Sequence, residues 1–179
     1  MSKLLLYCTK AKNKYDRLVC DEHYGKPFYL YGAITENFES LNGKIVAECD
    51  YEVEELQIVY GKGWETKTIK GTENIEKLTC LSRDKLYQYC KGNGYAIHIK
   101  NLHIFDEPKK LREFTTFTDF GKPITKAPQN MCNVCDDLEH NCERYILISI
   151  RSEWLCKILN KEKTVEIRKK VLKEMLNNE

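Results

Sequence analysis

The sequence lacks the features that mark several common function classes. It contains no apolar run near the ~18 residues of a membrane-spanning helix, and Leu4–Leu6 is too short for the apolar core of a secretion signal. We find no glycine-rich phosphate-binding loop, no serine-hydrolase elbow, no internal repeat and no low-complexity tract. These absences favour a cytoplasmic protein with no membrane partner.

A strong excess of one charge is also missing. The 29 basic and 27 acidic side chains give a net charge of +2, which is too even to establish a nucleic-acid partner by itself. Such a partner has to be argued from local clusters of residues. At 179 residues the chain predicts a single domain, 1–179, that is large enough to bury a substantial core.

Cysteine, in contrast, is abundant. Nine cysteines form an odd set in a chain without a secretion signal, which favours reduced thiols that mostly pack in the core. Cys132, Cys135, His140 and Cys142 offer four soft ligands of the kind that structural zinc prefers. Their spacing is tighter than that of a usual zinc knuckle, so a pair of ordinary thiols and a redox switch remain alternatives.

The most informative stretch lies near the end of the sequence and predicts a strand, a helix and a strand. Residues 145–150 are apolar and β-branched, and Ser152 can cap a helix that carries Trp154, Leu155 and Ile158. Residues 163–168 then alternate, which places Thr164, Glu166 and Arg168 on one face and Val165 and Ile167 on the other.

Elsewhere short strands dominate the expected structure. We expect strands at 3–8, 44–51 with a continuation to 60, and 95–105, with a turn at Asn42-Gly43. Helices are expected at 82–91 and 169–177, a loop at 61–76, and a bend at Asn101. Many short strands with few helices predict a mostly β (α+β) small barrel with short flanking helices.

Several motifs together resemble the ASCH domains of the PUA-like superfamily, in particular the small bacterial and prophage type. They are Ile148-Ser-Ile-Arg-Ser-Glu-Trp154, Glu162-Lys-Thr-Val-Glu-Ile-Arg168, Leu6-Tyr-Cys-Thr-Lys10, Asn42-Gly-Lys-Ile-Val-Ala-Glu48, Tyr95-Ala-Ile-His98, Ile104 to Phe114 and Pro128-Gln-Asn-Met-Cys132. The resemblance covers most of the chain and implies a PUA-like β-barrel.

The order of these motifs differs from that family. There the strand–helix–strand signature opens the domain and Tyr-Cys-Thr-Lys follows it, whereas here the signature comes last. The chain therefore resembles a circular permutant in which residues 132–144 form a Cys-rich linker to the permuted segment 145–168. A frame-shifted fragment that ends in the start of a second copy is the alternative.

The polar face of residues 163–168 offers candidates for catalysis. Lys163, Thr164 and Glu166 could form an acid–base set in which burial lowers the pKa of Lys163. Some small ASCH proteins are amidohydrolases acting on acetylcytidine with a lysine, a threonine and a glutamate, and their lysine matches Lys163. Their threonine falls where this chain has Glu166, and a simple Glu166–Arg168 pair is the alternative interpretation.

A binding role draws on more residues. We expect a cleft formed by Arg151, Trp154, Lys163, Thr164, Glu166 and Arg168, with Thr9, Lys10 and His98 nearby. Cations there would hold phosphate, Trp154 would stack on a base, and Glu166 with Thr164 would read base edges. Trp154 could instead be a core residue, and His98 a hydrogen-bonded structural histidine.

The leading hypothesis from the sequence is a binding module for RNA or a modified nucleotide. The alternatives are a hydrolase acting on a modified nucleoside or on RNA, and an interaction protein encoded by a mobile element. The spacing of Lys-Thr-x-Glu-x-Arg favours the first two hypotheses and does not separate binding from catalysis.

Overall fold

The computed structural model describes residues 2–9, 28–30, 33–35, 41, 43–60, 67–70, 73–117, 121–136 and 143–176. The chain divides into two compact units, and each unit combines two separate stretches of sequence. Unit 1 contains Met1–Asp50 and Asn101–Asn160, and unit 2 contains Tyr51–Lys100 and Lys161–Glu179. None of the helices in these described ranges has the length and apolar character that crossing a membrane requires.

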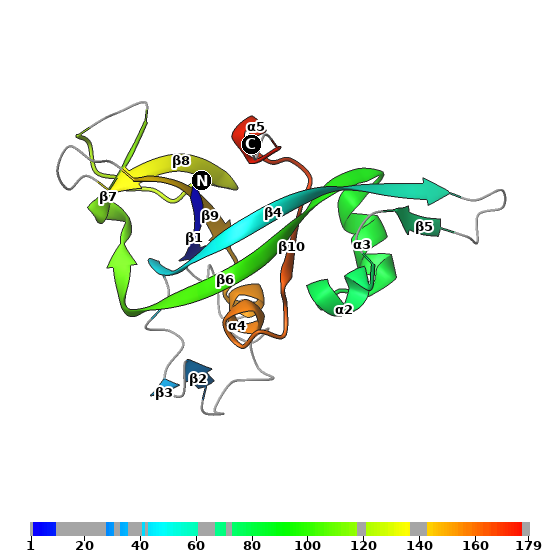
Figure 1. The fold of residues 1–179 in the computed structure, drawn as a ribbon, viewed down its shortest axis with the longest axis horizontal. Coiled ribbons are helices and arrows are strands. Elements are labelled where there is room, and N and C mark those ends of the chain that lie inside the picture. The colour runs from blue at the N-terminus through cyan, green and yellow to red at the C-terminus, as the bar shows by residue number, and fades with distance from the viewer. Residues whose placement is uncertain are drawn as a thin grey trace. The chain divides into compact units, whose positions relative to one another are not determined.

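Unit 1 is built on a sheet whose central strands are buried. Strand β1 (Lys3–Cys8) pairs in parallel with β9 (Arg144–Ile150) and antiparallel with the first part of β4 (Lys44–Tyr60). Beyond β9 follow β8 (Met131–Asp136) and β7 (Phe114–Thr116), both antiparallel. Figure 1 shows β1 and β9 side by side. Both strands are almost continuously apolar because both of their faces are covered.

The core of unit 1 gathers side chains from all of these strands. One cluster consists of Leu5, Tyr7, Ile45, Leu111, Phe114, Ile124, Val134, Tyr145 and Leu147. Leu111 belongs to the short 3-10 helix η2 (Leu111–Glu113). Helix α4 (Ser152–Leu159) follows β9, and the small pair β2 (Phe28–Leu30) and β3 (Ala33–Thr35) forms a separate antiparallel hairpin.

Strand β6 (Asn93–Lys110) bends at Asn101, as the sequence predicts. Asn101 has φ 48°, a left-handed conformation that asparagine tolerates better than most residues. Its Nδ2 donates a hydrogen bond of 2.7 Å to Asp50 Oδ2 on β4. This contact holds the bend at the point where β4 and β6 each pass from one unit to the other.

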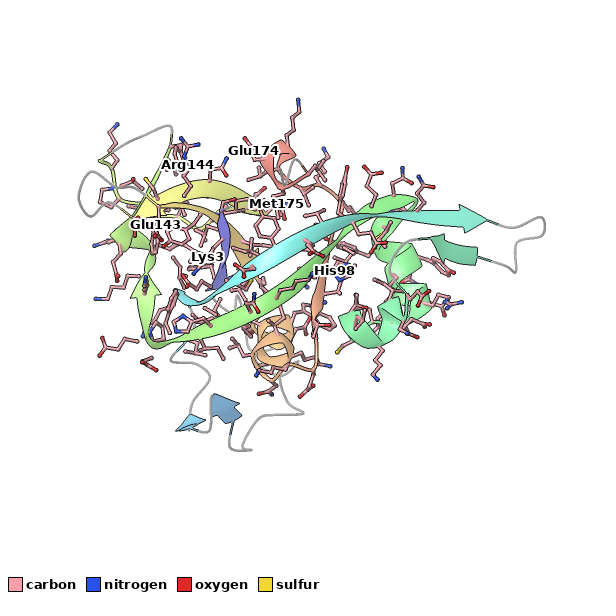
Figure 2. All side chains as sticks on the ribbon, in the orientation of Figure 1. Lys3, His98, Glu143, Arg144, Glu174 and Met175 are labelled. Carbon is pink, nitrogen blue, oxygen red and sulfur yellow. The ribbon has the colours of Figure 1, made fainter. Side chains whose placement is uncertain are left out.

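Unit 2 continues β4 and β6 and adds two further strands. Strand β10 (Val165–Arg168) pairs antiparallel with β6, and β5 (Lys67–Lys70) pairs antiparallel with the end of β4. Helices α2 (Ile75–Thr79) and α3 (Arg83–Cys90) pack on this sheet through Leu56, Ile75, Leu86, Tyr87, Cys90, Ala96, Val165 and Ile167. A last short helix, α5 (Lys173–Leu176), buries Met175, which Figure 2 labels.

The mostly β class with a few short helices is confirmed, but the closed barrel is wrong. The strand order β10-β6-β4-β1-β9-β8-β7, with β5 branching from β4, has two ends and does not return on itself among the described strands. Alternating sequence patterns define the faces of strands. Closure depends on twist and on pairing between distant strands, which no local pattern encodes.

Three local predictions also need correction. Residues 132–136 belong to strand β8, so the expected Cys-rich linker begins as part of the sheet, and 137–142 lie outside the described residues. The expected loop at 61–76 contains β5 and the start of α2. The C-terminal helix spans Lys173–Leu176, a shorter range than the expected 169–177.

Candidate functional site

The predicted alternation along β10 is confirmed and gives the strand two different faces. Val165 and Ile167 are buried in the apolar cluster that joins the sheet to α2 and α3. Glu166 and Arg168 lie on the opposite face, where their side chains are only 10% and 13% exposed. Polar groups of this kind are rarely buried unless they are paired.

Those polar groups form a buried ionic cluster, which we call the β10 triad: Lys163, Glu166 and Arg168. Lys163 Nζ lies 3.4 Å from Glu166 Oε2, and Arg168 donates from one of its terminal nitrogens to Glu166 Oε1 at 3.0 Å. One carboxylate therefore faces two cations. The alternative interpretation of Glu166 and Arg168 as a pair is what the structure shows, with Lys163 as an additional partner.

Lys163 also links β10 to the end of α2. Its ammonium donates to the carbonyl oxygen of Thr79 at 3.0 Å and to that of Val165 at 2.6 Å. The backbone N–H of Thr164 donates to Leu78 O at 2.9 Å, and the Cys80 thiol donates to Glu162 O at 3.3 Å. A lysine ammonium carries three donors, and here oxygen atoms of two carbonyls and one carboxylate lie within its reach.

Burial lowers the pKa of Lys163, while the neighbouring Glu166 carboxylate raises it and so opposes the shift. A catalytic amine needs a lone pair directed at its substrate. In this structure the amine nitrogen is surrounded by acceptors, which suits a charged ammonium that holds α2 against β10. The catalytic set of Lys163, Thr164 and Glu166 therefore stays a prediction, and its geometry favours a structural role for Lys163.

His98 lies on β6, but the structure does not place it with the β10 triad. Its cross-strand partner is Val165, and paired residues of neighbouring strands share a face. Glu166 is the next residue of β10 and so faces the other side. His98 Nε2 instead lies 3.2 Å from Glu54 Oε2 on β4, and Figure 2 labels this histidine.

Helix α4 carries the second set of predicted site residues. Its buried side consists of Ser152, Leu155, Cys156, Ile158 and Leu159. Trp154 and Lys157, three residues apart, lie on the other side of the helix, and Arg151 precedes the helix as its N-cap residue. Arg151 is exposed and Trp154 is partly exposed. The alternative interpretation of Trp154 as a core residue stays beside the stacking role, because a partly exposed ring is also partly buried.

Within this outward face, which we call the α4 stripe (Arg151, Trp154 and Lys157), the aromatic ring lies beside a cation. Lys157 Nζ is 5.7 Å from the centroid of the Trp154 ring, within the range of a cation–π contact. Arg151 is the N-cap residue of the helix, one turn before Trp154. The arrangement offers a flat aromatic surface with a positive charge on either side along the helix.

The remaining predicted binding residues have separate positions. Thr9 follows β1, and its backbone N–H donates to Ile150 O at 2.9 Å. Lys10 lies outside the described residues. Thr9 and the α4 stripe belong to unit 1, whereas His98, Thr164 and the β10 triad belong to unit 2. One joint cleft formed by all of them stays a prediction.

The cysteine cluster is only partly described. Cys132 and Cys135 lie on β8 at an odd spacing, so their side chains point to opposite faces of the sheet. Cys132 packs against the apolar core, and Cys135 Sγ lies 3.3 Å from Thr115 Oγ1. Among the described side chains there is no group of three or more metal-ligating residues. Because His140 and Cys142 lie outside those ranges, the zinc site stays a prediction.

Lys157 and Glu54 contact predicted site residues but are not among the site residues that the sequence predicts. Lys157 could have been found, because it falls one turn after Trp154 on the predicted helix. Glu54 could not, because its contact with His98 depends on how β4 and β6 pair. Comparisons of the chain with protein-family models, with curated proteins and with solved structures found no match.

Proposed function

We propose that this protein is a binding module for RNA or for a modified nucleotide and that it makes contact through the α4 stripe. The observation that carries the proposal is the outward position of Trp154, with Lys157 near its ring and Arg151 one turn away. Single-stranded nucleic acid is bound in this way in many proteins, because bases stack on aromatic rings while cations contact the phosphates.

The β10 triad has a supporting part in this proposal. Glu166 already pairs with both Lys163 and Arg168, so its carboxylate is engaged within the protein. Lys163 fixes the end of α2 through Thr79 O. Arg168, the more exposed of the two cations, is the member of the triad from which we expect a phosphate contact.

The proposal predicts different effects for the aromatic and the cationic members of the α4 stripe. Trp154→Ala should weaken binding of single-stranded RNA by about 1–3 kcal/mol through lost stacking, with little change in salt dependence. Arg151→Gln should weaken binding and lower the slope of log affinity against log salt by about 0.7. Fluorescence anisotropy at about 50 and about 200 mM salt measures both effects.

Two controls make the result interpretable. Trp154→Phe keeps an aromatic surface and should retain most of the affinity. Arg112→Gln removes one exposed arginine charge from η2, outside the stripe, and should leave binding near that of the parent. Parent protein that binds neither RNA nor nucleotides, or a Trp154→Ala variant that binds like the parent, would contradict the proposed function.

A hydrolase acting on a modified nucleoside or on RNA is the second candidate. The observation in its favour is the lowered pKa of Lys163, next to Glu166. A turnover assay with acetylcytidine and with RNA, run on the binding samples, distinguishes it from a pure binding module. An interaction protein of a mobile element remains the third hypothesis from the sequence, and its expected result is absence of both binding and turnover.

The relationship to ASCH domains stays a prediction that rests on the sequence motifs alone. The described strands form an open sheet and so do not support the barrel that the resemblance implies. The cytoplasmic location likewise rests on the sequence, and it is compatible with an RNA partner.

A further inference from the structure

Helix α3 in unit 2 has an outward face whose side chains do not belong to the apolar cluster of this unit. Its buried residues, Leu86, Tyr87 and Cys90, contribute to the apolar cluster with β6 and β10. The opposite face presents Lys85, Gln88 and Tyr89, which are exposed. Because Gln88 and Tyr89 follow Lys85 by three and four residues, about one helical turn, each of them neighbours Lys85 on the surface.

Tyr89 is the exceptional member of this face. Among the residues whose burial the structure describes, only Tyr89 and Leu176 are large hydrophobic side chains with strong exposure, at 42% and 44%. An exposed tyrosine gains little from the core and presents a flat ring to solvent. Such residues are enriched where a protein meets another molecule.

A cation from a different element completes the surface. Lys169 directly follows β10, and its Nζ lies 5.2 Å from the centroid of the Tyr89 ring. The same ammonium lies near enough to the Cys90 thiol to lower its pKa, although burial outweighs this effect and raises that pKa overall. The contact with the Tyr89 ring therefore places Lys169 beside the last turn of α3.

The charges around the ring are mainly positive. Lys85 lies one turn before Tyr89 on the same face, and Lys169 lies beside the ring. Asp84 is the acidic residue of this helix, and it lies about 100° further around the axis from Lys85. An anionic partner with flat groups fits this surface better than a cationic or purely apolar one.

We infer that Lys85, Gln88, Tyr89 and Lys169, here named the Tyr89 patch, bind single-stranded nucleic acid. Tyr89 stacks on a base, the two lysines contact the flanking phosphates, and the Gln88 amide lies in position to meet a base edge. The inference rests on the proposed function for the class of partner. It adds a second contact surface, in the unit that does not carry the α4 stripe.

The test compares variants of the full chain for binding to an RNA oligonucleotide of about ten nucleotides, a length in the range of single-strand sites. Tyr89→Ala should lose roughly 5- to 150-fold in affinity, and Tyr89→Phe should bind like the parent because it keeps the stacking surface. Lys169→Gln should lower the slope of log affinity against log salt by about 0.7. Because Tyr89 and Lys169 lie at the surface, both variants should keep the parent's melting temperature.

Controls separate stacking from charge. Lys126→Gln removes one exposed charge in unit 1 and should leave the affinity near that of the parent. An inorganic polyphosphate chain carries the charges without bases, so Tyr89→Ala should bind it as well as the parent does. An equal loss for polyphosphate and RNA would overturn the inference, since it would make the patch a general anion surface.

The same series separates this inference from the proposed function. If Trp154→Ala weakens RNA binding and both Tyr89→Ala and Lys169→Gln match the parent, the Tyr89 patch is overturned and the α4 stripe stands. If Tyr89→Ala and Lys169→Gln show the expected losses and Trp154→Ala has no effect, the patch stands and the α4 stripe fails. Parent protein that binds no RNA overturns both.

Discussion

At the scale of single residues, Lys163 shows how a site prediction can be right about proximity while the role of the residue stays a prediction. The sequence indicates that Lys163 and Glu166 belong together, and their charged atoms lie 3.4 Å apart. The contact with Val165 O lies within the same segment, whereas the contact with Thr79 O depends on the end of α2, a helix whose start falls in the loop expected at 61–76. A buried ammonium that donates to two carbonyl oxygens stabilises the contact between α2 and β10. A reaction at this nitrogen would require the loss of those hydrogen bonds.

The β10 triad makes a prediction about stability. Glu166→Gln should lower the free energy of unfolding by about 3–5 kcal/mol, because it leaves two mostly buried cations without their carboxylate. Lys163→Met should cost less, about 1–3 kcal/mol, since the Glu166–Arg168 pair survives while the Lys163–Glu166 ion pair and two hydrogen bonds are lost. Urea-induced unfolding measures both changes. Glu162→Gln, an exposed acid on the same segment, is the matched control, and a Glu166→Gln variant as stable as this control would rule out the triad.

Cys49 provides a prediction about pH. Burial in β4 raises the pKa of its thiol from 9.0 to about 12. Above pH 9 the unfolded chain releases this proton while the folded chain retains it, so the group's contribution to stability is lost as pH rises towards 12. The expected slope is at most about 1.4 kcal/mol per pH unit. Urea unfolding at increasing pH should show a steeper decline for the parent than for Cys49→Val, and identical slopes would contradict the assignment.

At the scale of secondary structure elements, α4 and β10 could be predicted because both have a clear period. The spacing of Leu155, Ile158 and Leu159 defines the buried side of α4, and Trp154 falls outside it. Strict alternation likewise places Val165 and Ile167 against the apolar cluster of unit 2. Local patterns are reliable where one face of an element is buried and the other is polar.

The same patterns could not supply the partners of each element. The sequence predicts His98 near the cleft that includes Glu166, but His98 lies opposite Val165, and a difference of one residue in register moves a side chain to the other face. The order of the motifs predicts a linker at 132–144, but residues 132–136 form β8, which is hydrogen-bonded to β7 on one side and to β9 on the other. Strand pairing and register depend on residues far apart in the sequence. The sequence pattern of one strand therefore does not predict a site that is formed by several strands.

At the scale of the whole molecule, each unit presents a surface on which a cation lies beside an aromatic ring of a helix. Unit 1 has Trp154 with Lys157, and unit 2 has Tyr89 with Lys169. The net charge of +2 does not indicate either surface, because the 27 acidic side chains nearly balance the 29 lysines and arginines in the sum. Local distribution of charge, rather than its sum, therefore supports the proposed nucleic-acid partner.

The arrangement of strands predicts how the chain responds to truncation. Strand β9 lies between β1 and β8, so a fragment of residues 1–144 would leave two largely apolar strands with open edges and should aggregate. A fragment of residues 1–160 keeps β9 and α4 and should be more soluble. Its unit 2 should be less stable, because Val165, Ile167 and the Lys163 contact with α2 are missing. Soluble yield, size-exclusion chromatography and near-UV circular dichroism compare the two fragments. A folded, monomeric 1–144 fragment would show that β9 is not required for the sheet of unit 1.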